Sequence, residues 1–219
     1  MVEMVGLWAG RRNCPREKYE WQDTWIEEGQ TQEADLPRVL MLGDSISRQY
    51  RGTVGKLLAG KAHIANSAGS HCVGDPLLAA ANAAVLDAFK FDVITVNNGL
   101  HGLDCPDGDY AKFLAEYIDF LKAKAPSAII LWVRTTPISI GGDTARLSPR
   151  NTRVEIRNKF ADAIMAERGI AGIDLYAATI GKTAELQTSD GIHFNDAGVS
   201  VISHCVADAI SKSLPNPGA

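Results

Sequence analysis

Short apolar runs alternate with helix-like stretches along most of the chain. The apolar runs lie at residues 38–43, 61–69, 91–99, 127–137 and 170–175. Between and after them, apolar residues recur at helical spacing over about 46–58, 76–89, 109–126 and 149–168, and again from about residue 195. Five strands alternating with helices predict an α/β fold, a three-layer α/β/α sandwich around a five-stranded parallel sheet.

Residues 1–35 differ from the rest of the chain. They are rich in charge and in tryptophan, and they show no clean hydrophobic period. We expect an N-terminal extension packed on a single domain that spans residues 36–219. The first residues lack a basic stretch followed by an apolar one, so we expect no signal peptide and a cytoplasmic location.

Composition narrows the classes of partner. Apolar residues make up 46% of the chain and charged residues 22%, which is ordinary for a globular protein. The net charge is −4 with no block of Lys or Arg, which argues against nucleic-acid and anionic-membrane partners. No apolar run is long enough to span a bilayer. We therefore expect a small-molecule substrate, while the oligomeric state has no signature in the sequence.

The four cysteines, Cys14, Cys72, Cys105 and Cys205, are far apart and form no CxxC pair. This argues against a zinc site, and free thiols in a reducing compartment are expected. The alternative is a disulfide between Cys72 and Cys105, whose loops fall at the same predicted edge of the sheet.

The loops that follow the strands are the places to look for chemistry, because ligands of such sheets bind beyond the carboxyl ends of the strands. The first strand ends in Gly43-Asp44-Ser45. Ser45 fits two roles. It could cap the following helix, or it could be a nucleophile whose oxyanion is stabilised by N–H groups of that helix.

The loop after the fifth strand, LQTSDGIHFNDAG, contains Asp190 and His193 three residues apart. A nucleophilic serine needs a general base, and the base needs an orienting carboxylate. Because this loop lies at the same predicted edge as Ser45, the three residues form a candidate triad. The alternatives are a surface Asp–His pair or metal ligands, but no other His/Asp/Cys cluster supports a metal site.

The loops after the second and third strands, NSAGSHCVG and VNNGLHG, are rich in Gly and Asn. Such loops let backbone N–H groups and amides approach a ligand, although Gly and Asn are common in turns generally. His71 in the second loop and Arg134 at the end of the fourth strand face the same edge. We expect both to contact substrate. The alternatives are a solvated loop histidine and an arginine paired with a carboxylate.

These four segments, in this order, resemble the conserved blocks of the SGNH/GDSL hydrolase superfamily over about residues 37–210. GDSIS matches the first block, with Ser45 as nucleophile, and SDGIHF matches the last, with Asp190 and His193. The resemblance implies a flavodoxin-like sheet and esterase-type acyl transfer that needs no metal or organic cofactor. It also implies an oxyanion hole made by the Ser45 N–H, a glycine N–H of the second block and an asparagine side chain of the third.

The two middle blocks depart from the superfamily pattern. The second reads Asn-Ser-Ala-Gly, so Gly69 is the expected N–H donor, with Ala68 as the alternative. In the third, His101 stands where the asparagine is usual. A neutral imidazole can still donate one N–H, so His101 is one candidate donor and Asn98 is the other.

The sequence thus predicts a serine esterase for short-chain acyl esters, acetyl in particular, on a carbohydrate. The carbohydrate part rests on NNGLH, GDSIS and DLY, which resemble segments of bacterial carbohydrate O-acetylesterases. The alternatives are a lipid, thioester or aryl-ester hydrolase of the same superfamily, and a catalytically decayed binding module. No P-loop or GxGxxG follows a strand, which argues against a nucleotide binder.

Overall fold

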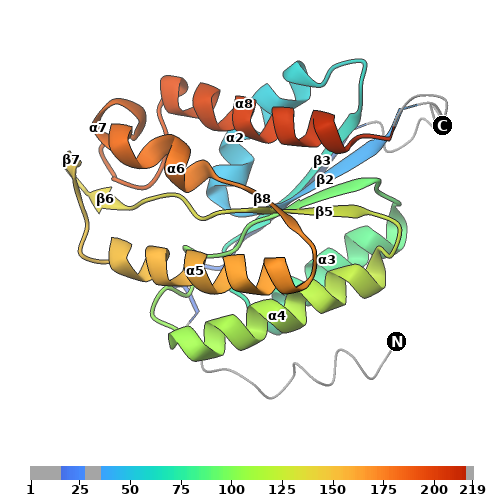
Figure 1. The fold of residues 1–219 in the computed structure, drawn as a ribbon, viewed down its shortest axis with the longest axis horizontal. Coiled ribbons are helices and arrows are strands. Elements are labelled where there is room, and N and C mark those ends of the chain that lie inside the picture. The colour runs from blue at the N-terminus through green and yellow to red at the C-terminus, as the bar shows by residue number, and fades with distance from the viewer. Residues whose placement is uncertain (1–15, 28–35, 216–219) are drawn as a thin grey trace.

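The computed structural model describes residues 16–27 and 36–215, and its centre is a six-stranded sheet (Figure 1). The strand order is β1-β3-β2-β4-β5-β8. All neighbouring pairs are parallel except β1 with β3. The strands are β1 (Gln22–Ile26), β2 (Arg38–Gly43), β3 (His63–Gly69), β4 (Val93–Val96), β5 (Ile129–Val133) and β8 (Ala171–Ile173).

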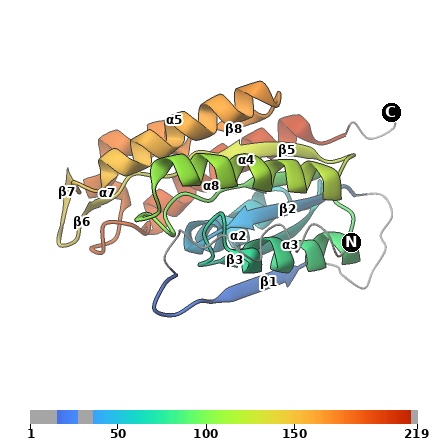
Figure 2. The same cartoon turned by 90° about the horizontal axis from the view of Figure 1, so that it is seen from below.

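Helices cover both faces of the sheet, so the predicted α/β/α sandwich is confirmed (Figures 1 and 2). Helices α2 (Ser45–Leu57) and α8 (Asp196–Ser213) bury one apolar cluster against the sheet. A second cluster lies on the other face, under α3 (Pro76–Ala88), α4 (Asp107–Lys124) and α5 (Asn151–Glu167). The ends of these helices agree with the sequence-based boundaries within two residues, because strong apolar periodicity marks them.

Asparagine and aspartate caps fix the start of the helices nearest the sheet edge. Asp44 accepts the N–H of Ile46 and caps α2, so the N-cap role considered for Ser45 belongs to its neighbour. Asp75 caps α3 in the same way, and Asn195 caps α8. Because Asp44 supplies the cap, the Ser45 hydroxyl is not needed for helix initiation.

Strand β1 comes from the N-terminal extension and was not predicted. It runs antiparallel along β3, with Gln22 opposite Gly69 and Ile26 opposite Ala65. Most of its side chains are exposed or half-buried, as at a sheet edge, so it has no apolar alternation to reveal it. The other parts of the extension, residues 1–15 and 28–35, lie outside the described residues.

The loops after β5 and β8 contain short elements that the sequence also left unassigned. The hairpin of β6 (Ser139–Ile140) and β7 (Asp143–Leu147) follows β5. After β8 come α6 (Leu175–Thr179), the 3₁₀ turn η1 (Ile180–Lys182) and α7 (Thr183–Leu186). Elements this short carry too few residues for a hydrophobic period to be detected.

Cys105 is disulfide-bonded, which corrects the expectation of free thiols. Cys72 and Cys205 are free, so the alternative pairing of Cys72 with Cys105 is also wrong. Cys14 lies outside the described residues. The burial of the Cys72 thiol raises its pKa to about 11, so this thiol is a poor nucleophile near neutral pH.

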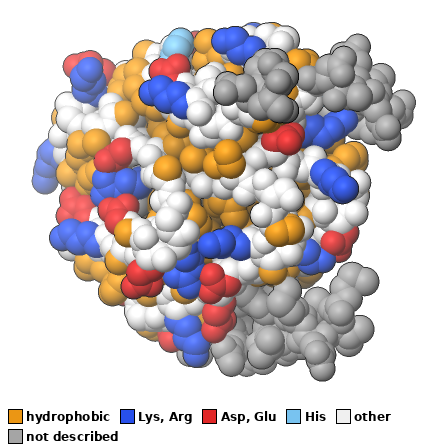
Figure 3. Space-filling view, turned by 45° about the vertical axis from the view of Figure 1, so that its right-hand side comes forward, with side chains coloured by type: hydrophobic (Ala, Val, Ile, Leu, Met, Phe, Trp, Pro, Cys, Tyr) orange, Lys and Arg blue, Asp and Glu red, His pale blue; other side chains and the backbone are white. Residues whose placement is uncertain are grey.

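The described residues include no helix that could cross a membrane, and the face shown in Figure 3 has no patch of a single charge. No described helix combines the length and the apolarity that crossing a bilayer requires. On the face drawn in Figure 3, basic and acidic side chains are interspersed among apolar ones.

Candidate active site

Ser45, His193 and Asp190 meet at the carboxyl edge of the sheet. Ser45 is the first residue of α2, directly after β2, and His193 lies in the loop between α7 and α8. The Nε2 atom of His193 is 2.8 Å from the Ser45 Oγ, and its Nδ1 atom is 2.6 Å from the Asp190 Oδ2. A hydroxyl, an imidazole and a carboxylate are thus linked in one hydrogen-bonded row, as general-base activation of a serine requires.

The other oxygen of Asp190 fixes the loop. Its Oδ1 accepts the N–H groups of Ile192 and His193 and the hydroxyl of Thr188, each at 2.9 Å. Partial burial by itself raises the pKa of Asp190. The hydrogen bonds from Ile192, His193 and Thr188 outweigh it and hold this pKa well below its usual range. The carboxylate is therefore charged whenever the imidazole needs a partner.

Gly191 lets this loop approach the β6–β7 hairpin. Its φ is +77°, and a Cβ here would come within 2.4 Å of the Ser139 carbonyl oxygen. The Ser139 N–H donates to the Gly191 carbonyl at 2.8 Å. Only glycine combines this backbone conformation with this contact, so the packing of the loop requires glycine directly after Asp190.

A cavity of about 510 Å³ opens beside Ser45 and His193. Leu100, Leu103, Ile138 and Ile192 supply apolar surface on its walls. Its polar lining residues are Arg16, Glu17, Ser45, His101, Asp104, Ser139, Arg150, Asp190 and His193. Its size and its mixed apolar and polar lining are typical of a small-molecule site.

Besides the Ser45 N–H, three groups were expected as oxyanion donors, and the structure places only one of them at the cavity. His101 lines the cavity with Ser45, whereas Gly69 and Asn98 are not among the lining residues. The Asn98 amide is engaged between loops: it donates to the His71 carbonyl at 2.8 Å and accepts the Val73 N–H at 3.0 Å. Gly69 is a buried strand residue opposite β1.

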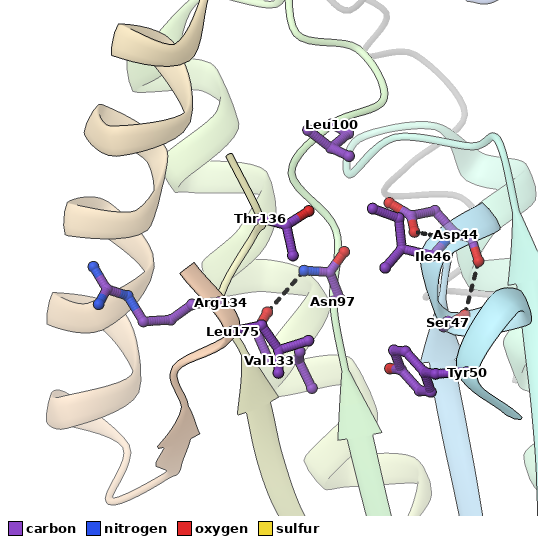
Figure 4. A pocket seen from close by; sticks show the side chains of 10 residues that line it. All are labelled: Asp44, Ile46, Ser47, Tyr50, Asn97, Leu100, Val133, Arg134, Thr136 and Leu175. Carbon is purple, nitrogen blue, oxygen red and sulfur yellow. Dashed lines mark hydrogen bonds between the residues drawn. The ribbon is translucent and has the colours of Figure 1, made fainter. Parts of the chain in front are cut away.

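The two residues expected to contact substrate are not brought to this cavity. His71 is 6% exposed, and its Nδ1 lies 3.2 Å from the Glu20 carboxylate. Arg134 points toward the α5 side of the sheet, away from Asp44 (Figure 4), and pairs with Asp162 and Asp174. The carboxylate partner that was the alternative for Arg134 is therefore the one observed.

Arg157 supports the third loop from inside and was not singled out in the sequence. It is fully buried on α5 and donates to the carbonyl oxygens of Gly99 at 3.0 Å, Gly102 at 2.7 Å and Cys105 at 3.2 Å. Its guanidinium also stacks on the Tyr110 ring at 4.4 Å. A buried charge is tolerated only when it is well paired, so these contacts fix the loop that carries His101.

Among the described residues, Glu20, His71 and Asp75 form one group that could ligate a metal ion. Both Asp75 oxygens already accept hydrogen bonds from the Arg16 guanidinium, at 2.7 and 3.1 Å. Because the guanidinium supplies the positive charge that this carboxylate needs, the group fits a metal ion poorly.

Comparison with known proteins identifies the family and the fold of the chain. The sequence profile of the GDSL-like lipase/acylhydrolase family matches residues 41–201. A search of the curated proteins finds no match. Solved structures do match, and they include a protein described as an SGNH hydrolase from Slackia heliotrinireducens. It is 21% identical with a TM-score of 0.63, and the alignment covers 80% of this chain and 99% of that one.

Two acetylxylan esterases share the fold. One, from Geobacillus stearothermophilus, is 16% identical with a TM-score of 0.65, over 80% of this chain and 94% of that one. The other, AlAXEase, is 17% identical with a TM-score of 0.65, over 79% and 99%. At these identities the likeness concerns the fold, whereas the profile covers most of the chain. This chain therefore belongs to the GDSL-like lipase/acylhydrolase family, within the SGNH/GDSL superfamily, and is a hydrolase of ester bonds.

Proposed function

We propose that the protein is a serine esterase in which Ser45, His193 and Asp190 act as the catalytic triad. The observation that carries this proposal is the row of two short hydrogen bonds, 2.8 Å from Ser45 to His193 and 2.6 Å from His193 to Asp190. The Ser45 Oγ attacks the ester carbonyl while the His193 Nε2 takes its proton. Asp190 orients the imidazole and stabilises the imidazolium.

The remaining steps use the same groups. The imidazolium of His193 gives its proton to the leaving alcohol, and the C–O bond of the ester breaks to leave an acyl-Ser45. A water molecule then loses a proton to His193 and attacks the acyl carbon. Collapse of this second tetrahedral intermediate returns the proton to the Ser45 oxygen and releases the carboxylic acid.

The proposed substrate is a short acyl ester, acetyl in particular, on a carbohydrate. Two proteins that share the fold are described as acetylxylan esterases. Charged and polar side chains surround the cavity, including Glu17, Asp104 and Arg150, and such groups suit a hydroxylated alcohol better than an alkyl chain. The second candidate is a lipid-ester hydrolase, and the apolar wall of Leu100, Leu103 and Ile138 favours it.

The test combines Ser45→Ala with a panel of acyl chain lengths. Ser45→Ala should abolish hydrolysis of p-nitrophenyl acetate and labelling by a fluorophosphonate, with unchanged circular dichroism. The matched control is Ser200→Ala, an exposed serine on α8, which should keep both. Activity in Ser45→Ala equal to that of the wild type would refute the triad. Faster turnover of octanoate than of acetate would favour the lipid candidate.

A further inference from the structure

A segment outside the family profile forms part of the wall of the cavity beside Ser45. The profile matches residues 41–201, whereas Arg16 and Glu17 line the cavity together with Ser45 and His193. The segment leads into β1, which lies at the edge of the sheet beside β3 (Figure 2). An ester that is held at Ser45 and fills the cavity therefore reaches this wall with a part remote from the triad.

The wall is anchored to the loop after β3 on both sides of Glu17. Arg16 binds Asp75 through two hydrogen bonds, at 2.7 and 3.1 Å. Glu20 accepts the Glu17 N–H at 2.9 Å through one carboxylate oxygen and the Ser70 hydroxyl at 2.6 Å through the other. These contacts hold the Glu17 backbone in place before a ligand arrives, which lowers the entropy cost of binding to it.

The Glu17 carboxylate has spare capacity to accept hydrogen bonds. Its Oε1 atom lies 3.2 Å from the His101 Nδ1, and no described residue donates to its Oε2. Its side chain is 47% exposed, so a molecule in the cavity can reach it. An ionised carboxylate offers about four acceptor positions, and most of those on Glu17 are open to the hydroxyl groups of a ligand.

The cationic residues that line the cavity are already paired with carboxylates. Arg16 binds Asp75, and Arg150 binds Asp104 at 2.9 Å. Among the described residues, no lysine or arginine forms an ion pair with Glu17. A ligand with a negative charge would therefore meet an uncompensated carboxylate at this wall, so the cavity favours a neutral ligand.

The pair of Asp104 and Arg150 adds both kinds of hydrogen-bonding group. The two side chains line the cavity and are 71% and 56% exposed. The Arg150 guanidinium keeps N–H groups beyond the one that binds Asp104, and the carboxylate keeps acceptor positions. A hydroxyl group both donates and accepts, so it can use this pair and Glu17. An ammonium group only donates and has no use for Arg150.

We propose that Glu17 is a specificity-determining residue that accepts a hydrogen bond from a hydroxyl group of a neutral, polyhydroxylated alcohol. This inference rests on the proposed function, because it needs an ester held at Ser45. The proposed acyl group is short, so most of the cavity of about 510 Å³ is left for the alcohol. The bond to an ionised acceptor is stronger than one between neutral groups, so its loss should be measurable.

The experiment compares kcat/KM for three acetate esters whose alcohols have rings of similar size. Mono-acetylated methyl xyloside is neutral and carries hydroxyl groups, cyclohexyl acetate carries none, and mono-acetylated methyl glucuronide carries a carboxylate. The wild type should prefer the xyloside about tenfold or more over each of the others. Acetylcholine, tested beside them, should be a poorer substrate than the xyloside.

Substitutions at Glu17 should change these ratios in a direction set by its charge. Glu17→Ala should lower the ratio of xyloside to cyclohexyl acetate about tenfold, mainly through KM. Glu17→Gln keeps the shape and an acceptor, so this ratio should fall only about threefold, while turnover of the glucuronide should rise relative to the xyloside. Glu167→Gln removes an exposed carboxylate at the far end of α5 and should keep the wild-type ratios.

Three results would overturn the inference: a wild type without preference for the xyloside, faster turnover of acetylcholine, or ratios that Glu17→Ala and Glu17→Gln leave unchanged. Circular dichroism checks that each variant is folded, and Glu17→Gln carries the test if Glu17→Ala is not. The proposed function is tested separately. Fluorophosphonate labelling of Ser45 and the loss of p-nitrophenyl acetate hydrolysis in Ser45→Ala do not depend on the preferred alcohol, so they can hold when this inference fails.

Discussion

Two imidazole–carboxylate pairs lie beside one cavity, and they are built in different ways. Asp190 and His193 are three residues apart in one loop, and the two oxygens of Asp190 accept four hydrogen bonds. Glu17 and His101 are 84 residues apart and share one contact of 3.2 Å. The first pair is formed within a turn, whereas the second exists only because two distant segments meet.

The two pairs also differ in how much the protein depends on them. The short contact of His193 with Asp190 is supported by backbone N–H groups that cannot rotate away. The Glu17 and Asp190 side chains are equally exposed, at 47% and 48%, so the two pairs differ in the backbone N–H groups that hold Asp190 and not in burial. We therefore expect activity to depend far more on the pair in the loop than on the pair across the cavity.

The largest difference is expected when each carboxylate loses its charge. Asp190→Asn should lower kcat roughly 10³- to 10⁴-fold. The imidazole would lose both the acceptor that keeps its proton on Nδ1 and the negative charge that stabilises the imidazolium. Glu17→Gln should lower kcat far less, because the Glu17 carboxylate contacts His101 and not a residue of the proposed triad. Steady-state kinetics at several pH values checks both. Equal losses in the two variants would show that the pairs do not have different roles.

The next effect concerns the turn that forms the first pair. Gly191→Ala should destabilise the protein by about 1–3 kcal/mol and lower kcat, because the new Cβ meets the Ser139 carbonyl. Gly169→Ala is the matched control: its φ is +67°, but nothing lies within 4 Å of the added carbon. Thermal melts and kinetics should show strain in both variants and an activity loss only in Gly191→Ala. Comparable activity losses would mean that the turn does not position His193.

The smallest expected effect is a fall in the stability of the folded protein at low pH. The pKa of Asp190 is lower in the folded protein than its ordinary value of about 3.9. The stabilisation is therefore fully present above that ordinary value and is lost as the pH falls toward the folded-state pKa. Below about pH 4, the melting temperature of the wild type should fall more steeply than that of Asp190→Asn. Parallel curves would contradict this linkage.

The sequence by itself determined the layers of the fold and the candidate triad. Continuous apolar strands and amphipathic helices have a period that can be read locally, and their order implies one shared edge. Ser45, Asp190 and His193 follow from the same logic. Two of them lie in a single turn, and the third directly follows a strand that ends at that edge.

Other features were decided by the tertiary structure. Strand β1 is polar and gains its place only from the free edge of β3. His71 and Arg134 lie at the expected edge but turn to carboxylates elsewhere, because a strand position fixes the edge and not the direction of a long or mobile side chain. The meeting of Glu17 with His101 depends on the anchoring of residues 16–20, which no local pattern encodes. Local periodicity thus determined where the chemistry lies, and long-range contacts decided which side chains reach it.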